Sequence, residues 1–108
     1  MENKNIKVFT VNYGKNKGFY ICVENMEKNN AVKVLQDNDI YLGILQREYN
    51  EGLYRYYGIK NGYIFTLGGY TSYTYNKCIF YKYIQQLKDN GFNIIDITKH
   101  KNNLKKYA

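Results

Sequence analysis

The residue types that most often carry out covalent chemistry are scarce in this chain. It has two cysteines, Cys22 and Cys78, and one histidine, His100. A nucleophilic thiol needs a base beside it, and His100 lies in a basic segment away from both cysteines. One histidine and two cysteines outside any C-x-x-C pattern also fall short of a zinc ligand set. We therefore predict reduced thiols, no catalytic cysteine and no metal site.

The carboxylates and glycines suggest no reactive site either. No spacing pairs the acids that could share acid and base work, which are Glu48, Glu51, Asp89 and Asp96. The sequence Asp37-Asn38-Asp39 lacks the remaining ligands of a calcium loop and is interpreted as a turn. The glycines at 68–69 match neither the P-loop nor the dinucleotide-binding pattern. The sequence thus predicts a protein that is not an enzyme and holds no cofactor.

The chain is rich in tyrosine, with 14 residues, and three predicted strands would position many of them. These strands cover 40–48, 53–60 and 63–68. Asn61-Gly62 is a strong hairpin signal, because both residues tolerate the positive φ of a type I′ turn. With a second two-residue turn at Glu51-Gly52, the three strands form a meander in which Glu48 lies opposite Arg55.

This register sorts the side chains onto two faces. The aliphatic face carries Ile40, Leu42, Ile44, Ile59 and Ile64. The opposite, tyrosine face carries Tyr41, Leu45, Arg47, Tyr54, Tyr56, Tyr63, Phe65 and Leu67. We expect a helix to cover the aliphatic face, which leaves a partner-binding surface of Tyr41, Arg47, Tyr54, Tyr56 and Tyr63. The alternative is that the tyrosines form a second core layer under the first hairpin and residues 26–36.

The other segments complete an α+β fold. Residues 5–13 and 18–25 flank a glycine-bounded loop and predict an opening hairpin, while residues 26–36 favour a short helix over a loop. An amphipathic helix follows over 74–90 and ends at Gly91, and a last strand covers 93–98. The predicted fold is a small antiparallel sheet (opening hairpin, three-stranded meander, last strand) packed on one amphipathic helix. It forms a single domain, 1–98, followed by a basic C-terminal tail, 99–108.

The positive charge is unevenly distributed. The net charge is +7, and the predicted tail holds four lysines and no acid, namely Lys99, Lys101, Lys105 and Lys106. Lys15 and Lys17 in the first loop add to it, whereas residues 31–98 are nearly neutral. The tail is either a frayed terminus or an arm that contacts phosphate groups or an acidic partner. An AT-rich genome would also raise the lysine, asparagine and tyrosine content without any selection for binding.

These features predict a non-catalytic binding protein that engages a host protein or nucleoprotein complex. In size, residue usage and lack of catalytic groups the chain resembles small inhibitors carried by phages and mobile elements, including anti-CRISPR proteins, although no motif carries this resemblance. The alternative is a protein that binds single-stranded RNA or DNA, with tyrosines stacking on bases and tail lysines following phosphates. No apolar run is long enough to span a bilayer, so we expect a cytoplasmic protein without membrane contact.

Overall fold

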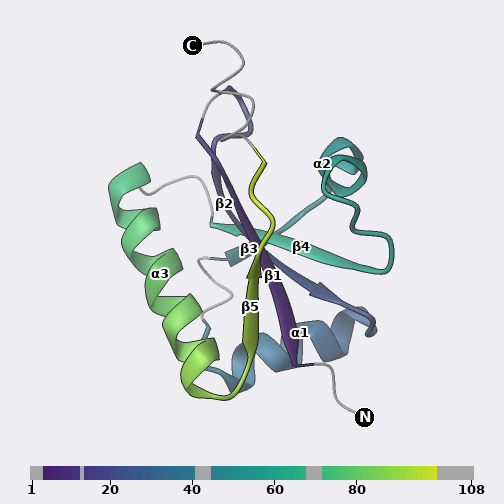
Figure 1. Ribbon diagram of the computed structural model, residues 1–108, viewed down its shortest axis with the longest axis vertical. Helices are drawn as coiled ribbons and strands as arrows, with labels where there is room; N and C mark the ends of the chain where they lie inside the picture. Colours follow the sequence, from purple (N-terminus) through teal and green to yellow (C-terminus); the bar gives the residue numbers. More distant parts are fainter. Residues whose placement is uncertain (1–3, 13, 41–44, 68–71, 100–108) are drawn as a thin grey trace.

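A computed structural model describes residues 4–12, 14–40, 45–67 and 72–99. These residues form a mixed five-stranded sheet packed with three helices, which confirms the α+β fold (Figure 1). Along the chain the elements are β1 (Asn5–Val11), β2 (Gly18–Glu24), α1 (Lys28–Asp37), β3 (Leu45–Glu48), α2 (Glu51–Tyr56), β4 (Gly62–Leu67), α3 (Tyr73–Asp89) and β5 (Asn93–Asp96). The strand order in the sheet is β3-β4-β2-β1-β5. No described helix is long and apolar enough to cross a membrane.

The opening hairpin is confirmed, but the sheet is not purely antiparallel. β1 pairs with β2 in antiparallel register, with Val11 opposite Gly18. β5 pairs with the other edge of β1 in parallel, with Ile6 opposite Ile94. β5 can lie parallel to β1 only if the chain first crosses back along the sheet. α3, which follows β4 and precedes β5 in the sequence, makes this crossover. The last strand therefore starts at the same end of the molecule as the first.

The three-stranded meander is wrong, because its middle strand is a helix. Residues 51–56 form α2, and β3 pairs directly with β4, so that Glu48 lies opposite Ile64 and not Arg55. The Asn50 side chain accepts a hydrogen bond from Gly52 N and begins the helix, where a strand turn was expected. Leu53 and Tyr57 follow four residues apart and are both buried, which is the spacing of a helix that packs on one side.

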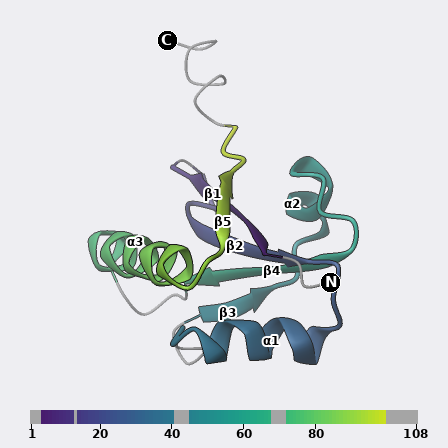
Figure 2. The same ribbon diagram turned by 60° about the horizontal axis from the view of Figure 1, so that its bottom comes forward.

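The helices therefore cover the opposite faces of the sheet from those predicted. Helices α1 and α3 cover one face of the sheet and α2 packs on the other, as Figures 1 and 2 show together. Leu45, Phe65 and Leu67, assigned to the tyrosine face, lie in the core that residues of α1 and α3 share. Ile59 and Ile64, assigned to the aliphatic face, lie in the second core with α2. Ile40 does lie on the α3 side, whereas Tyr41, Leu42 and Ile44 lie outside the described residues.

The long amphipathic helix is confirmed. α3 buries Phe80, Tyr83, Ile84 and Leu87 and exposes Lys82 and Gln85. Gln86 is half-buried, since its side chain donates a 2.9 Å hydrogen bond to Asn38 O beyond the end of α1. The helix ends as predicted, with Gly91 at φ +92° and Phe92 N bonded to Leu87 O.

All three described helices end in this same left-handed motif. The residues with positive φ are Asp39, Gly58 and Gly91, and each is followed by an apolar residue whose N–H bonds back five positions into the helix. Those apolar residues are Ile40, Ile59 and Phe92, and all three pack into a core. This repeated ending turns the chain after each helix and places the next apolar residue in a core.

Gly62 has a structural role that differs from the turn predicted for it. It is the first residue of β4 and lies opposite Glu24 of β2. A Cβ on Gly62 would lie 2.6 Å from Val23 O and 2.8 Å from Glu24 Cα. Glycine is therefore required by the close approach of two backbones within the sheet, not by a hairpin turn.

Candidate functional site

The residues predicted to form one exposed tyrosine surface lie in separate environments. Tyr63 and Arg47 lie on the side of the sheet that α1 and α3 cover, because each shares a strand face with the core on that side. Tyr54 and Tyr56 lie in α2, on the other side. Tyr41 falls outside the described residues. The four described residues of the predicted surface therefore do not form one continuous surface.

Tyr54 is held within the fold by its hydroxyl. The hydroxyl donates a hydrogen bond to Glu48 O at 2.9 Å and accepts one from Ile64 N at 3.0 Å. It thus bridges β3 and β4 from the helix that packs over them. Its side chain is half-buried and packs against the second core.

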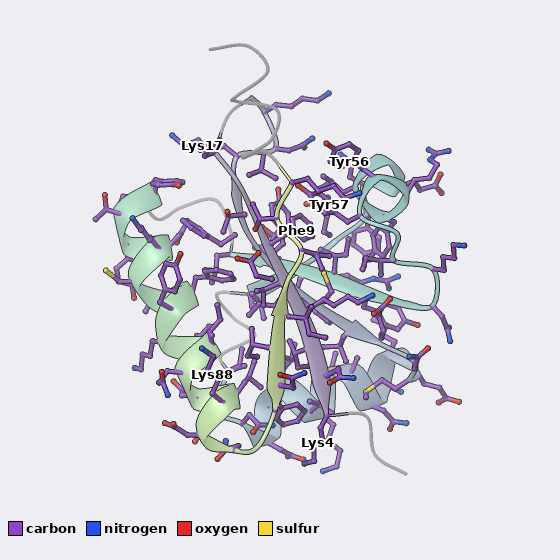
Figure 3. All side chains as sticks on the ribbon, in the orientation of Figure 1. Lys4, Phe9, Lys17, Tyr56, Tyr57 and Lys88 are labelled. Carbon is purple, nitrogen blue, oxygen red and sulfur yellow. The ribbon has the colours of Figure 1, made fainter. Side chains whose placement is uncertain are left out.

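Tyr56, two residues further, stands at the outer end of a row of aromatic rings. The rings of Tyr20 and Phe9 are stacked with centroids 4.6 Å apart, and those of Phe9 and Tyr57 with centroids 3.7 Å apart. Tyr56 meets Tyr57 edge-on at 5.0 Å and is 49% exposed (Figure 3). Because three buried rings fix its neighbour, Tyr56 presents an oriented aromatic surface to solvent.

Lys99, the first residue of the predicted tail, lies on this same aromatic row. Its ammonium nitrogen is 4.9 Å from the centroid of the Tyr56 ring and donates a 2.8 Å hydrogen bond to Tyr56 O. This carbonyl is at the C-terminal end of α2, where a cation is favoured. Lys99 therefore joins the two features that the sequence offered separately, the tyrosines and the basic tail. Lys101, Lys105 and Lys106 lie outside the described residues.

A second lysine–tyrosine pair lies near the turn between β1 and β2. Lys17 Nζ is 4.4 Å from the centroid of the Tyr73 ring, and Tyr73 in turn contacts the Phe19 ring at 4.9 Å. Lys15 is exposed in the same turn. We call this group the hairpin end and define it by Lys15, Lys17, Tyr56, Tyr73 and Lys99. The Lys17–Tyr73 pair lies on the α3 side of the sheet and the Lys99–Tyr56 pair on the α2 side.

The hairpin end gathers residues that are far apart in sequence. β1 runs toward the turn and β5 runs parallel to it, so the residue that follows β5 arrives at the same end. Two bonds secure this approach, from Ile97 N to Val8 O and from Thr10 N to the Thr98 hydroxyl. Figure 3 shows Lys17, Tyr56 and Tyr57 toward one end of the molecule and Lys4 and Lys88 toward the other.

The described acids are unevenly distributed over the molecule, and lysines accompany them at the α1 end, among them Lys28, Lys33 and Lys88. Five of the described acids border α1 or lie where β2 and α3 end, namely Glu24, Glu27, Asp37, Asp39 and Asp89. Figure 1 places α1 and the C-terminal end of α3 away from the hairpin end. Lys15, Lys17 and Lys99 form no ion pair with a described acid, so the positive charge at the hairpin end favours an anionic partner.

A pocket of about 340 Å³ opens between the β1–β2 turn and α2. Its lining includes apolar residues of the second core, the rings of Tyr56 and Tyr57, and the polar side chains of three residues, Lys15, Asn16 and Asn50. A pocket of this size lies at the lower end of the range that small ligands occupy. It adjoins the hairpin end through Lys15 and Tyr56.

Arg47 forms a different candidate contact at the edge strand β3. Its guanidinium carbon lies 4.6 Å from the ring centroids of both Tyr49 and Tyr63. Tyr49 is 68% exposed, and Arg47 Nε is buried without a hydrogen-bond partner among the described residues. Arginine and tyrosine are residue types that often dominate protein interfaces.

Catalytic groups do not gather anywhere in the described part of the chain. Cys22 is buried in the sheet, where burial and the nearby Glu24 raise the pKa of its thiol to about 12. It stays protonated at neutral pH and is a poor nucleophile. Cys78 is exposed on α3. No group of three or more histidine, cysteine or acidic side chains that could hold a metal ion occurs among the described residues.

Sequence reasoning missed four residues of this region, Asn16, Asn50, Tyr57 and Tyr73. Asn50 was treated as part of a strand turn, although Asn followed by Glu is also a helix start. Gly58 followed by Ile59 is a helix-ending signal that would have revealed α2 and hence the burial of Tyr57. Nothing in the sequence places Asn16 or Tyr73 near these residues.

No family model matches the chain, and no curated protein or solved structure is significantly similar to it.

Proposed function

We propose that this chain is a non-catalytic binding protein that engages a host nucleoprotein complex and contacts its single-stranded nucleic acid with the hairpin end. The observation that supports it is the pairing of lysine with exposed tyrosine, at Lys99 with Tyr56 and at Lys17 with Tyr73. Proteins that bind single strands combine a basic surface for the backbone with aromatic rings for the bases. An inhibitor of host defence carried by a phage or mobile element is one member of this class.

Two contributions to the binding free energy, base stacking on tyrosine and neutralisation of phosphates by lysine, suit such a partner. Stacking of one base on an aromatic side chain contributes about 1–3 kcal/mol and tolerates any base sequence. Lysines that neutralise phosphates release counterions, and the affinity then falls as salt rises. Tyr56 and Lys99 could supply the two contributions together, since the lysine ammonium lies 4.9 Å from the centroid of the tyrosine ring. Residues 31–98 are nearly neutral, but the fold brings Lys15 and Lys17 to the same end of the molecule as Lys99.

The first test is the binding of a fluorescent oligothymidylate of about 12 nucleotides, followed by anisotropy. If Lys15, Lys17 and Lys99 each neutralise one phosphate, raising salt from about 50 to about 200 mM should weaken binding roughly 20-fold. Replacing Lys15 and Lys99 together with glutamine should weaken binding at low salt and reduce the salt dependence.

A matched control removes two lysines, and so the same amount of charge, at the other end of the molecule. Lys28 and Lys88 are exposed on α1 and at the end of α3, and the double change to glutamine there should leave binding unchanged. Equal weakening by both double variants would mean that only net charge matters. Absence of binding at low salt would reject the proposal.

A second candidate is a protein partner that contacts Arg47 and Tyr49. The exposed ring and the guanidinium held between two rings support it. Arg47→Lys keeps the charge and removes the planar group that lies between the rings. A host protein that is captured after nuclease treatment, lost with Arg47→Lys and kept with the Lys15 and Lys99 double variant would favour this candidate over the first.

A further inference from the structure

We infer that the pocket between the β1–β2 turn and α2 receives one unstacked nucleotide of the bound strand, with its base inside and its phosphate near Lys15 and Lys99. The inference rests on the proposed function, because it names the unit of the strand that the hairpin end would recognise. The ligand chemistry is a planar heterocycle joined to a phosphate. A free nucleotide has the same chemistry, so the test must separate the two sources.

The walls of the pocket suit a flat, partly apolar group. Val11 and Leu53 supply buried aliphatic surface, and the rings of Tyr56 and Tyr57 supply aromatic surface. The two rings are nearly perpendicular to each other, at 84°. The volume of about 340 Å³ suits a group of nucleotide size and is too small for a folded peptide segment.

The polar residues of the pocket suit the edge of a base. Asn16 and Asn50 both line it, and an asparagine amide offers a donor and an acceptor together. Asn50 Oδ1 is used by Gly52 N, whereas no described residue accepts a hydrogen bond from Asn16 Nδ2. The one contact between the two side chains, from Asn50 Nδ2 to Asn16 Oδ1, is long at 3.4 Å. Asn16 can therefore turn toward a ligand at little cost.

The charges beside the pocket suit a phosphate. Lys15 lines the pocket, and Lys99 lies on the ring of Tyr56 that forms part of its wall. Neither lysine forms an ion pair with a described acid. Lys99 uses one ammonium hydrogen for Tyr56 O, which leaves two donors for another acceptor. The arrangement thus places base-sized apolar space and two cations side by side.

The experiment follows the amide signals of the isotope-labelled full chain by nuclear magnetic resonance during three titrations. The probes are uridine 5′-monophosphate, inorganic phosphate and the oligothymidylate. We expect the nucleotide and the oligonucleotide to shift the Asn16 side-chain amide and the Gly52 backbone amide, and inorganic phosphate to leave both unchanged. Asn16→Ala and the isosteric Asn16→Asp should each weaken nucleotide binding at least fivefold.

Both variants should fold, because the Asn16 contact that holds the turn uses its backbone oxygen, which accepts a 2.6 Å bond from the Tyr20 hydroxyl. Oligonucleotide binding that leaves the pocket signals and the Asn16 variants unaffected would overturn this inference and leave the proposed function standing. Nucleotide binding in the pocket without oligonucleotide binding would assign a free nucleotide as ligand and overturn both the strand as its source and the proposed function. No shift of any amide signal of the chain with either the nucleotide or the oligonucleotide would overturn both.

Discussion

Tyr54 and Tyr56 lie two residues apart in α2 and should respond differently to the same substitution. Tyr56→Ala removes a ring that is 49% exposed, so unfolding should change little while oligonucleotide binding weakens by about 1–3 kcal/mol. Tyr54→Ala removes a hydroxyl that bridges β3 and β4 and a ring that packs on the core. Its free energy of unfolding should fall by roughly 3–5 kcal/mol, as for other aromatic truncations. Thermal melts and anisotropy on both variants measure the two effects.

Tyr54→Phe separates the hydroxyl from the ring. It keeps the packing and leaves Ile64 N and Glu48 O without this partner, which should cost about 1–2 kcal/mol of stability. Strong unfolding by Tyr56→Ala would show instead that its ring belongs to the core. In that case the exposed end of the aromatic row could not be the binding surface.

Tyr20 should make the protein lose stability in alkaline solution. Burial, and secondarily the nearby Glu48, raises the pKa of its hydroxyl from 10.0 to about 12. In the unfolded chain the hydroxyl ionises near pH 10, while the folded protein keeps the proton. The stabilising contribution is therefore complete below about pH 9 and is lost as the pH rises to about 12, by roughly 2 kcal/mol.

Denaturant unfolding measured from neutral to alkaline pH tests this effect. Tyr20→Phe should be less stable at neutral pH, because it lacks the bond to Asn16 O, but its stability should fall less steeply above pH 9. Tyr75 is 47% exposed and serves as the control, since Tyr75→Phe should leave the slope unchanged. Parallel slopes for the wild type and Tyr20→Phe would contradict the assignment.

At the scale of elements, α3 should anchor the larger core through Leu87. Its side chain is 0% exposed and its carbonyl accepts the bond that ends the helix. Leu87→Ala should lower the free energy of unfolding by about 2–5 kcal/mol in denaturant titrations. Gln85→Ala on the exposed side of the same helix should change it by less than about 0.5 kcal/mol. A loss below 1 kcal/mol for Leu87→Ala would mean that the helix is not fixed at this point.

The elements that the sequence predicted correctly are those with a strong local signal. The opening hairpin has glycines on both sides of its turn, and α3 has a long apolar stripe followed by Gly91. The short helix over 26–36 was favoured over a loop and is observed as α1. In these segments the local preference and the tertiary structure agree, so the pattern is sufficient.

The middle of the chain shows where local signals compete. The segment Glu51–Tyr56 contains two tyrosines and a glycine, which are typical of strands and turns, yet it is helical. The Asn50 cap and the burial of Leu53 and Tyr57 on the sheet outweigh these weak preferences. Leu45, Arg47, Tyr63 and Phe65 share one face of the sheet, as predicted, but α1 and α3 cover that face and α2 packs on the other.

At the scale of the whole molecule, the candidate site depends on a pairing that no local pattern reveals. Lys99 reaches Tyr56 because β5 pairs in parallel with β1 after the α3 crossover. The composition predicted tyrosine and lysine as the binding residues but could not show which of them meet. Arg47, Tyr56 and Tyr63 were named in advance, whereas the pocket and its asparagines depend on α2 and on the turn that faces it.

The boundary predicted at residue 98 can be tested by shortening the chain. Beyond β5, Ile97 bonds to Val8 and packs in the second core, and the Thr98 hydroxyl accepts from Thr10. A chain ending at Lys99 keeps all these contacts. Its midpoint of thermal unfolding should therefore stay within about 4 °C of the full chain, which corresponds to less than about 1 kcal/mol.

A chain ending at Phe92 should behave very differently, because it lacks β5 and both bonds to β1. β1 would become an exposed edge strand, and the apolar surfaces of Ile94 and Ile97 would be lost from the two cores. Both side chains are half-buried, so their burial contributes about 1–3 kcal/mol, to which the lost pairing of β1 with β5 adds, against the 5–15 kcal/mol typical of a domain. We expect this chain to unfold without a sharp transition in thermal melts followed by circular dichroism. If the chain ending at Lys99 lost as much stability, the domain would extend beyond residue 98 and the basic segment would be part of the fold.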